Sequence, residues 1–141
     1  MKPLVLAAIL LAAAGCVTHP PTRVDLNPAW QATKTIVFRH YPAHASGVDD
    51  AQLCLTTDWA ETIEGTSKVR RRVHAQLVGP NHVQVRVEVQ ADLSKHPLTG
   101  TPDPEHPEWG NPHDDMTYSE SLQIEIERAL LPLCPPPGSS R

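Results

Sequence analysis

Two alternating segments in the middle of the chain constrain its fold most strongly. From His82 to Leu93 every second residue is apolar, and the residues between them are polar. A two-residue period places successive side chains on opposite faces of a β-strand. Residues 68–77 alternate in the same way, and Gly79-Pro80-Asn81 separates the two segments. We therefore predict an antiparallel β-hairpin with one buried face and one polar face.

The charged residues of the hairpin indicate its register. One register aligns the valines of the two strands and also places two pairs of oppositely charged residues opposite each other. Each such pair stabilises the sheet by about 0.2–1 kcal/mol. A slip by one residue would move the valines to the polar face. The expected pairs are Leu77 with Val83, Val73 with Val87, Arg72 with Glu88, and Lys68 with Asp92. Arg71 falls among the apolar positions, so burial there would require a carboxylate or carbonyl partner.

One helix is predicted before the strands in the sequence and one after them. Asn27-Pro28 is typical of a helix start, so we expect a helix over residues 28–40. Residues 52–60 alternate and predict a strand. Thr117 and Glu120 fit a capping box that opens a helix over residues 117–131. The expected fold class is α+β, a two-layer domain of order α-β-β-β-α in which both helices cover one face of a three-stranded antiparallel sheet.

A proline-rich loop is expected before the last helix, over residues 94–116. His96, His106 and His113 lie in it among several carboxylates, and both groups are ligands for Zn or Cu. The alternative interpretation is a solvated polar loop whose acidic end leads into a helix N-terminus. Trp109 of the same loop is predicted either to contact a partner protein or to fold back over the core.

The first sixteen residues indicate export. Lys2 is followed by an apolar run, residues 4–14, which has the length of a signal-peptide core and is too short to span a bilayer. Ala13-Ala14-Gly15-Cys16 resembles the lipobox of bacterial lipoprotein precursors. That resemblance implies a signal peptide over residues 1–15 and lipidation of Cys16. Val17 in place of Asp favours the outer membrane, with the protein facing the periplasm. The alternative is an ordinary secretory signal that leaves Cys16 as a thiol or a disulfide partner.

The predicted organisation after the signal peptide is a tether over residues 16–26, a domain over 27–134 and a disordered tail over 135–141. If Cys16 carries lipid, Cys54 and Cys134 remain. An oxidising compartment permits a disulfide between them, and two separate thiols are the alternative.

The predicted order of elements resembles a known family. A strand containing Leu55-Thr56-Thr57-Asp58-Trp59 is followed by the arginine-rich Val69–Val73 strand, a valine-alternating strand, and a helix after a loop rich in Pro and Trp. This arrangement is similar to the small α+β domain of the BamC family of outer-membrane lipoproteins and of related envelope lipoproteins. The resemblance implies an accessory subunit of an envelope assembly machine, without catalytic residues.

Charge and motifs narrow the function further. The net charge of −4 argues against a nucleic-acid partner, which requires a basic face. The chain contains neither a Gly-x-Ser-x-Gly elbow nor a glycine-rich phosphate loop, so we expect no enzyme activity and no cofactor. We predict a non-catalytic, lipid-anchored interaction or assembly module, held on the membrane through Cys16 and bound to another envelope protein. The alternative is a periplasmic metal-binding lipoprotein that uses loop 95–115.

Overall fold

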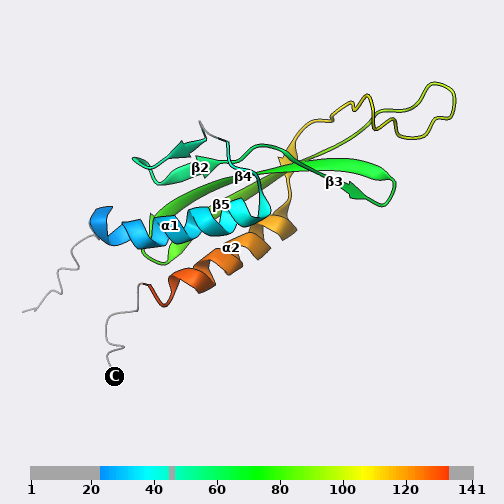
Figure 1. Cartoon of the computed structure of the whole chain (residues 1–141). Helices are drawn as coiled ribbons and strands as arrows, with labels where there is room; N and C mark the ends of the chain where they lie inside the picture. Colours follow the sequence, from blue (N-terminus) through cyan, green and yellow to red (C-terminus); the bar gives the residue numbers. More distant parts are fainter. Residues whose placement is uncertain (1–22, 45–46, 134–141) are drawn as a thin grey trace, which may run out of the picture.

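The fold was analysed in a computed structural model, which describes residues 23–44 and 47–133 (Figure 1). Two helices and a six-stranded antiparallel sheet form an α+β domain. The predicted signal peptide, Cys16, Cys134 and the predicted tail lie outside the described residues. The elements are α1 (Arg23–His40), β1 (Val48–Asp49), β2 (Cys54–Thr56), β3 (Ala60–Glu64), β4 (Ser67–Gly79), β5 (His82–Ala91), β6 (His113–Asp114) and α2 (Met116–Leu130).

The sheet is larger than the three strands predicted. Its strand order is β1-β2-β4-β5-β6, and β3 pairs with β4 beyond the end of β2. The three-stranded prediction is therefore wrong. Two of the additional strands, β1 and β6, are two-residue segments, and β6 lies in the stretch predicted as a loop. Strands this short leave no alternation in the sequence, and they form because β2 and β5 offer them an edge.

The predicted strand over residues 52–60 is also wrong in its extent, because it divides into β2 and β3. Thr57 lies at the division. The Val73 backbone N–H donates to Thr57 Oγ1 at 2.9 Å, and the Thr57 N–H donates to the Val73 carbonyl at 2.9 Å. A side-chain oxygen thus accepts the bond that a carbonyl would accept in a continuous strand, and regular pairing resumes at Ala60.

The predicted hairpin register is confirmed for all four pairs. Leu77 pairs with Val83, Val73 with Val87, and Arg72 with Glu88. Lys68 also lies opposite Asp92, whose backbone N–H donates to the Lys68 carbonyl at 2.8 Å. The ammonium group of Lys68, however, is not paired with the Asp92 carboxylate. Lys68 Nζ instead lies 2.9 Å from Glu61 Oε2, because β3 continues along the other edge of β4 and brings that carboxylate closer.

Both helices start earlier than predicted. Helix α1 begins at Arg23, so part of the predicted tether is helical and Pro28 lies inside the helix. Helix α2 begins at Met116, and its N-cap is Asp115, whose Oδ1 accepts the Tyr118 N–H at 3.2 Å. The predicted capping box at Thr117 is therefore misplaced by two residues. The position of the N-cap depends on where β6 ends and the chain turns into α2, as well as on the local sequence.

The core lies between the two antiparallel helices and one face of the β4–β5 hairpin, as predicted (Figure 1). Its largest fully buried side chains come from both layers: Trp30, Val37, Ile126 and Leu130 from the helices, and Val73, Val83 and Val87 from the sheet. Burial of each large apolar side chain contributes about 1.5–3 kcal/mol.

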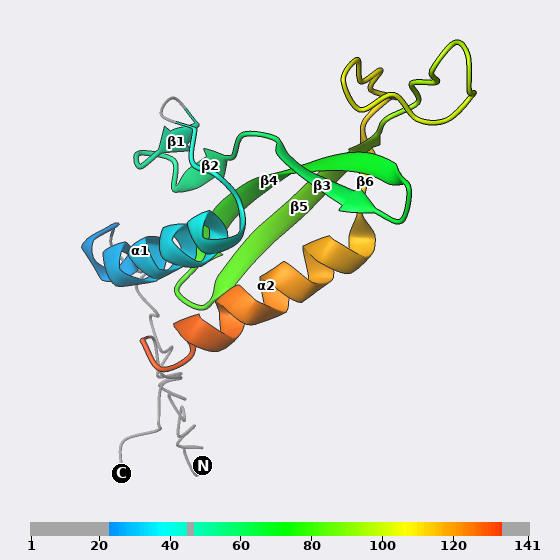
Figure 2. The same cartoon turned by 45° about the vertical axis from the view of Figure 1, so that its right-hand side comes forward.

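The molecule has two distinct ends. The start of α1, the end of α2 and the β4–β5 turn gather at one end, whereas the β3–β4 hairpin and the loop after β5 extend past the helices at the other (Figure 2). A hydrogen bond of 2.6 Å between His82 Nδ1 and Glu127 Oε1 joins the turn to the end of α2. We call the first end the anchor end, because the predicted lipid anchor at Cys16 precedes α1 in the sequence, and the other the distal end.

Candidate functional site

A groove of about 520 Å³ opens on the helix side of the sheet toward the distal end. It lies where α1 ends, α2 begins and β3 extends beyond both helices (Figures 1 and 2). Its lining combines apolar and aromatic side chains with carboxylates at the rim, a composition typical of binding sites. The lining residues are His40, Tyr41, Ala60, Thr62, Ile63, Glu64, Arg71, Tyr118, Ser121, Leu122 and Glu125. We refer to it as the distal groove.

Arg71 forms the polar base of the distal groove. Its side chain is only 10% exposed, with Nη1 2.6 Å from Glu64 Oε1 and Nε 3.0 Å from Asp115 Oδ2. The ring of Tyr118 lies 4.1 Å from the guanidinium carbon. Burial by itself would lower the pKa of Arg71, but the hydrogen bonds to Glu64 and Asp115 outweigh it and raise that pKa. The expected carboxylate partner of Arg71 is thus confirmed, and there are two of them.

The rim of the distal groove carries a second ionic contact and a neutral phenol. Glu125 Oε2 lies 3.0 Å from His40 Nε2, and its Oε1 lies 3.7 Å from Arg39 Nη1. Burial raises the pKa of the Tyr41 hydroxyl, partly offset by the positive charge of Arg71. The hydroxyl of Tyr41 is therefore protonated at neutral pH and available as a hydrogen-bond donor in the groove.

The opposite face of the sheet carries a ladder of stacked arginines and tryptophans. The guanidinium carbon of Arg70 lies 4.7 Å from the ring centre of Trp59 and 4.3 Å from that of Trp109. Arg72 stacks on Trp59 at 4.6 Å. Trp109 thus folds back onto the sheet, but onto the face away from the helices and not over the core. These contacts cover the polar face with cation–π pairs.

A hydrogen-bonded chain on that face links Thr56, His74 and Glu88. Thr56 Oγ1 lies 2.9 Å from His74 Nδ1, and His74 Nε2 lies 3.1 Å from Glu88 Oε2. Hydroxyl, imidazole and carboxylate in series are the parts of a nucleophile–base–acid relay. Here Glu88 also contacts Arg72 at 2.6 Å and Arg86 at 3.2 Å. Two arginines therefore neutralise the carboxylate that would have to support an imidazolium.

The sequence did not single out this chain of residues because its members lie on three different strands. The sequence indicated only the position of Glu88, through the hairpin register that places it opposite Arg72. A hollow of about 350 Å³ beside it is lined in part by Cys54, His74 and Arg86.

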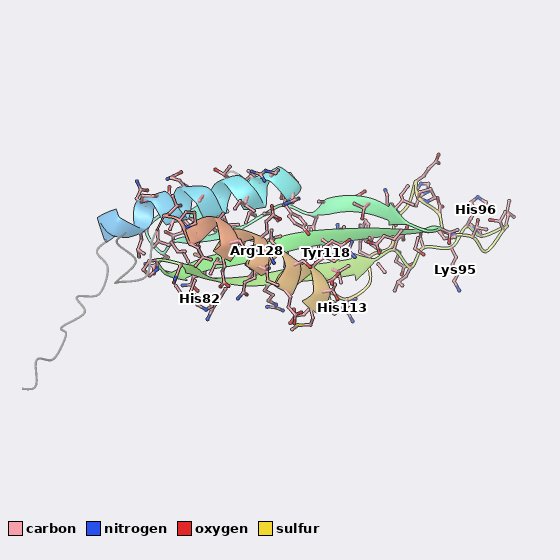
Figure 3. The ribbon with its side chains drawn as sticks, turned by 90° about the horizontal axis from the view of Figure 1, so that it is seen from below. His82, Lys95, His96, His113, Tyr118 and Arg128 are labelled. Carbon is pink, nitrogen blue, oxygen red and sulfur yellow. The ribbon has the colours of Figure 1, made fainter. Side chains whose placement is uncertain are left out.

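The three histidines predicted as metal ligands are not brought together. Figure 3 shows His96 near the far end of the loop and His113 beside the start of α2. His106 Nδ1 lies 3.3 Å from Asp103 Oδ2, within the loop. Across residues 23–44 and 47–133, no three His, Cys, Asp or Glu side chains converge on a point where a metal ion would fit.

The base of the same loop is held by Asp92. Its Oδ1 accepts the backbone N–H groups of Ser94, at 2.8 Å, and Glu108, at 2.9 Å. Burial would raise the pKa of Asp92, but these backbone hydrogen bonds outweigh it and lower that pKa. One buried carboxylate thus closes both ends of a fourteen-residue loop, from residue 94 to residue 107.

Cys54 lies half-buried on β2 with a free thiol, whereas Cys134 and Cys16 lie outside the described residues. Within the described part of the chain, neither helix has the length and apolarity needed to cross a bilayer. Comparisons with protein-family models, curated proteins and solved structures found no match to this chain.

Proposed function

We propose that this protein is a non-catalytic, lipid-anchored module of the bacterial envelope that binds another envelope protein through the distal groove. The sequence supports the anchor through the lipobox-like residues 13–16. The main observation that supports a role in binding is that the groove lies at the end of the domain opposite the anchor end. A binding surface on an anchored protein must remain accessible when the opposite end is held at the bilayer.

The distance between anchor and domain is short. Six residues, 17–22, separate Cys16 from the first residue of α1, and they span at most about 22 Å when fully extended. The anchor end would therefore be held beside the membrane, and the distal groove would open away from it. Figure 3 shows this polarity along α2, with Tyr118 on its first turn and Arg128 near its last.

Exposed apolar side chains support a partner at the distal end. Tyr118 is 45% exposed and lines the distal groove, and Ile63 of β3, at the edge of the groove, is 73% exposed. Met116, next to the groove on α2, is 63% exposed. Apolar and aromatic side chains gathered around a depression are typical of protein-binding surfaces.

Site-specific photo-crosslinking in intact cells tests this function. A photoreactive phenylalanine analogue at Tyr118, in the groove, is compared with the same analogue at Ile124, which is similarly exposed on α2 but does not line the groove. We expect a discrete adduct with an envelope protein from position 118 and none from position 124. Equal labelling from both positions, or no adduct from either, would contradict the proposal.

A further inference from the structure

The outer edge of β3 is open and lies along the distal groove. Residues 60–64 pair with residues 67–71 of β4 on one side, and no strand of the described chain pairs with their other side. The neighbouring strand β2 is covered at that edge by β1, through the pairs Val48–Leu55 and Asp49–Cys54. An added strand alongside β3 would therefore extend the row that β1 begins.

The side chains of β3 divide between the groove and the opposite face. Ala60, Thr62 and Glu64 share the groove side with Arg71, because Ala60 pairs directly with Arg71 in the sheet. A strand added at this edge would likewise send alternate side chains into the groove and the others away from it. The groove offers Tyr41, Tyr118 and Leu122 to apolar side chains of such a segment.

The charges that line the distal groove indicate which side chains a bound segment would carry. Its lining holds two carboxylates, Glu64 and Glu125, whose side chains are 47% and 40% exposed, against one guanidinium, Arg71. Arg71 is already bound by Glu64 and by Asp115 beneath the surface, so it offers little charge to an anionic ligand. Glu64 contacts Arg71, and Glu125 contacts His40 and Arg39. Both carboxylates are nevertheless far more exposed than the Arg71 guanidinium, so they can accept further hydrogen bonds from a basic side chain.

We infer that β3 and the distal groove bind an extended segment of a partner protein by strand addition, with apolar side chains in the groove and basic side chains at its rim. This inference rests on the proposed function, because it names the kind of partner that the same groove receives. Main-chain hydrogen bonds to β3 would provide much of the affinity, and the groove would provide the selectivity.

The test uses the mature, lipid-modified chain in nanodiscs and a synthetic peptide, acetyl-Lys-Thr-Val-Thr-Val-Thr-Lys-amide, whose valines and lysines share one face of an extended strand. We expect binding with slowed hydrogen exchange at amides of residues 60–64, by at least tenfold. A peptide with Glu in place of both lysines should bind at least tenfold more weakly. Thr62→Lys, which places a cation on the groove side of β3, should weaken binding of the basic peptide at least tenfold. Thr66→Lys, in the exposed β3–β4 turn, is the matched control and should leave binding unchanged.

Several results would overturn the inference. These are no binding at millimolar peptide, equal binding by the Thr62→Lys variant, protection at strands other than β3, or pairing of β3 with a second copy of the chain, seen as a dimer by light scattering. Failure of the peptide test with a retained adduct at Tyr118 would reject strand addition alone. Loss of the adduct together with preserved peptide binding would reject the envelope role and not the site.

Discussion

Arg71 shows how a single charged residue can occupy a position in an apolar pattern. It takes the inward-facing place between Val69 and Val73, where both neighbours are buried. Two carboxylates and a tyrosine ring surround its guanidinium, and the partner most distant in sequence, Tyr118, lies 47 positions along the chain. A buried charge is tolerated when it is paired and hydrogen-bonded in this way.

Replacement of Arg71 by Met should lower the free energy of unfolding by about 2–4 kcal/mol, because Asp115 would remain largely buried without its cation. Arg39→Met, on an arginine whose side chain is 63% exposed, should change it by less than about 0.5 kcal/mol. Urea unfolding at neutral pH measures both. Equal stability of the two variants would show that Arg71 contributes no more than a surface residue.

Glu88 predicts how stability depends on pH. Burial would raise its pKa, but the hydrogen bonds from Arg72 and His74 outweigh burial and hold the pKa below its ordinary value of 4.5. A carboxyl group whose pKa is lowered by folding stabilises the protein above the pKa of the unfolded state and loses that contribution as pH falls through the folded pKa. The free energy of unfolding should therefore decrease as pH falls below about 4.5.

The Glu88→Gln variant should show a smaller decrease over the same pH range, because its side chain cannot be protonated, and should be less stable than the parent at neutral pH. Urea unfolding at a series of pH values between about 3 and 7 measures both effects. An unchanged pH profile in Glu88→Gln would contradict the role assigned to this carboxylate.

At the scale of elements, the junction between α2 and the sheet depends on Ser119. This buried side chain accepts the Val87 backbone N–H at 2.9 Å and donates to the Asp115 carbonyl at 2.7 Å. Val87 lies just before the short pairing of β5 with β6, so its N–H has a side-chain partner where a longer β6 would supply a carbonyl. The first turn of α2 thus completes the edge of the sheet.

The Ser119→Ala variant should be less stable by about 1–3 kcal/mol, because it leaves the Val87 N–H buried without a partner. The same substitution at Ser121, whose side chain is exposed on α2, is the control and should have little effect. Thermal or urea unfolding compares them. Hydrogen exchange at the Val87 amide should become faster in Ser119→Ala alone, and equal exchange in both variants would disprove the assignment.

At the scale of the whole molecule, the two ends have different tasks in the proposed function. The anchor end would be held near the bilayer by lipid on Cys16, and the distal end would present the groove and the open edge of β3. More than one acyl chain is required for lasting attachment to a bilayer. Membrane association should therefore depend on the cysteine at position 16 and on no other.

The Cys16→Ser variant should move from the membrane fraction to the soluble fraction of the cell, whereas Cys54→Ser should remain with the membrane. Fractionation followed by mass spectrometry of the N-terminal peptide measures location and lipidation together. A Cys16→Ser protein that stays in the membrane fraction would contradict the anchoring proposal.

Local periodicity was sufficient to predict part of the fold from the sequence. The two-residue period of β4 and β5 fixed their faces, and the hydrophobic pairs together with Arg72 and Glu88 fixed their register. The two helices and the α+β class were also predictable, because apolar spacing and helix-start signals act within a few residues. The need of Arg71 for a carboxylate partner followed from its place in the pattern alone.

The tertiary structure decided everything that depends on residues far apart in the chain. Strands β1 and β6 exist only because an edge of β2 or β5 is present beside them. The distal groove combines the end of α1, the start of α2 and β3, none of which indicates a site by itself. Contacts between residues far apart in the chain form because the whole domain buries its apolar surface together. A short segment of sequence does not show how that surface is buried.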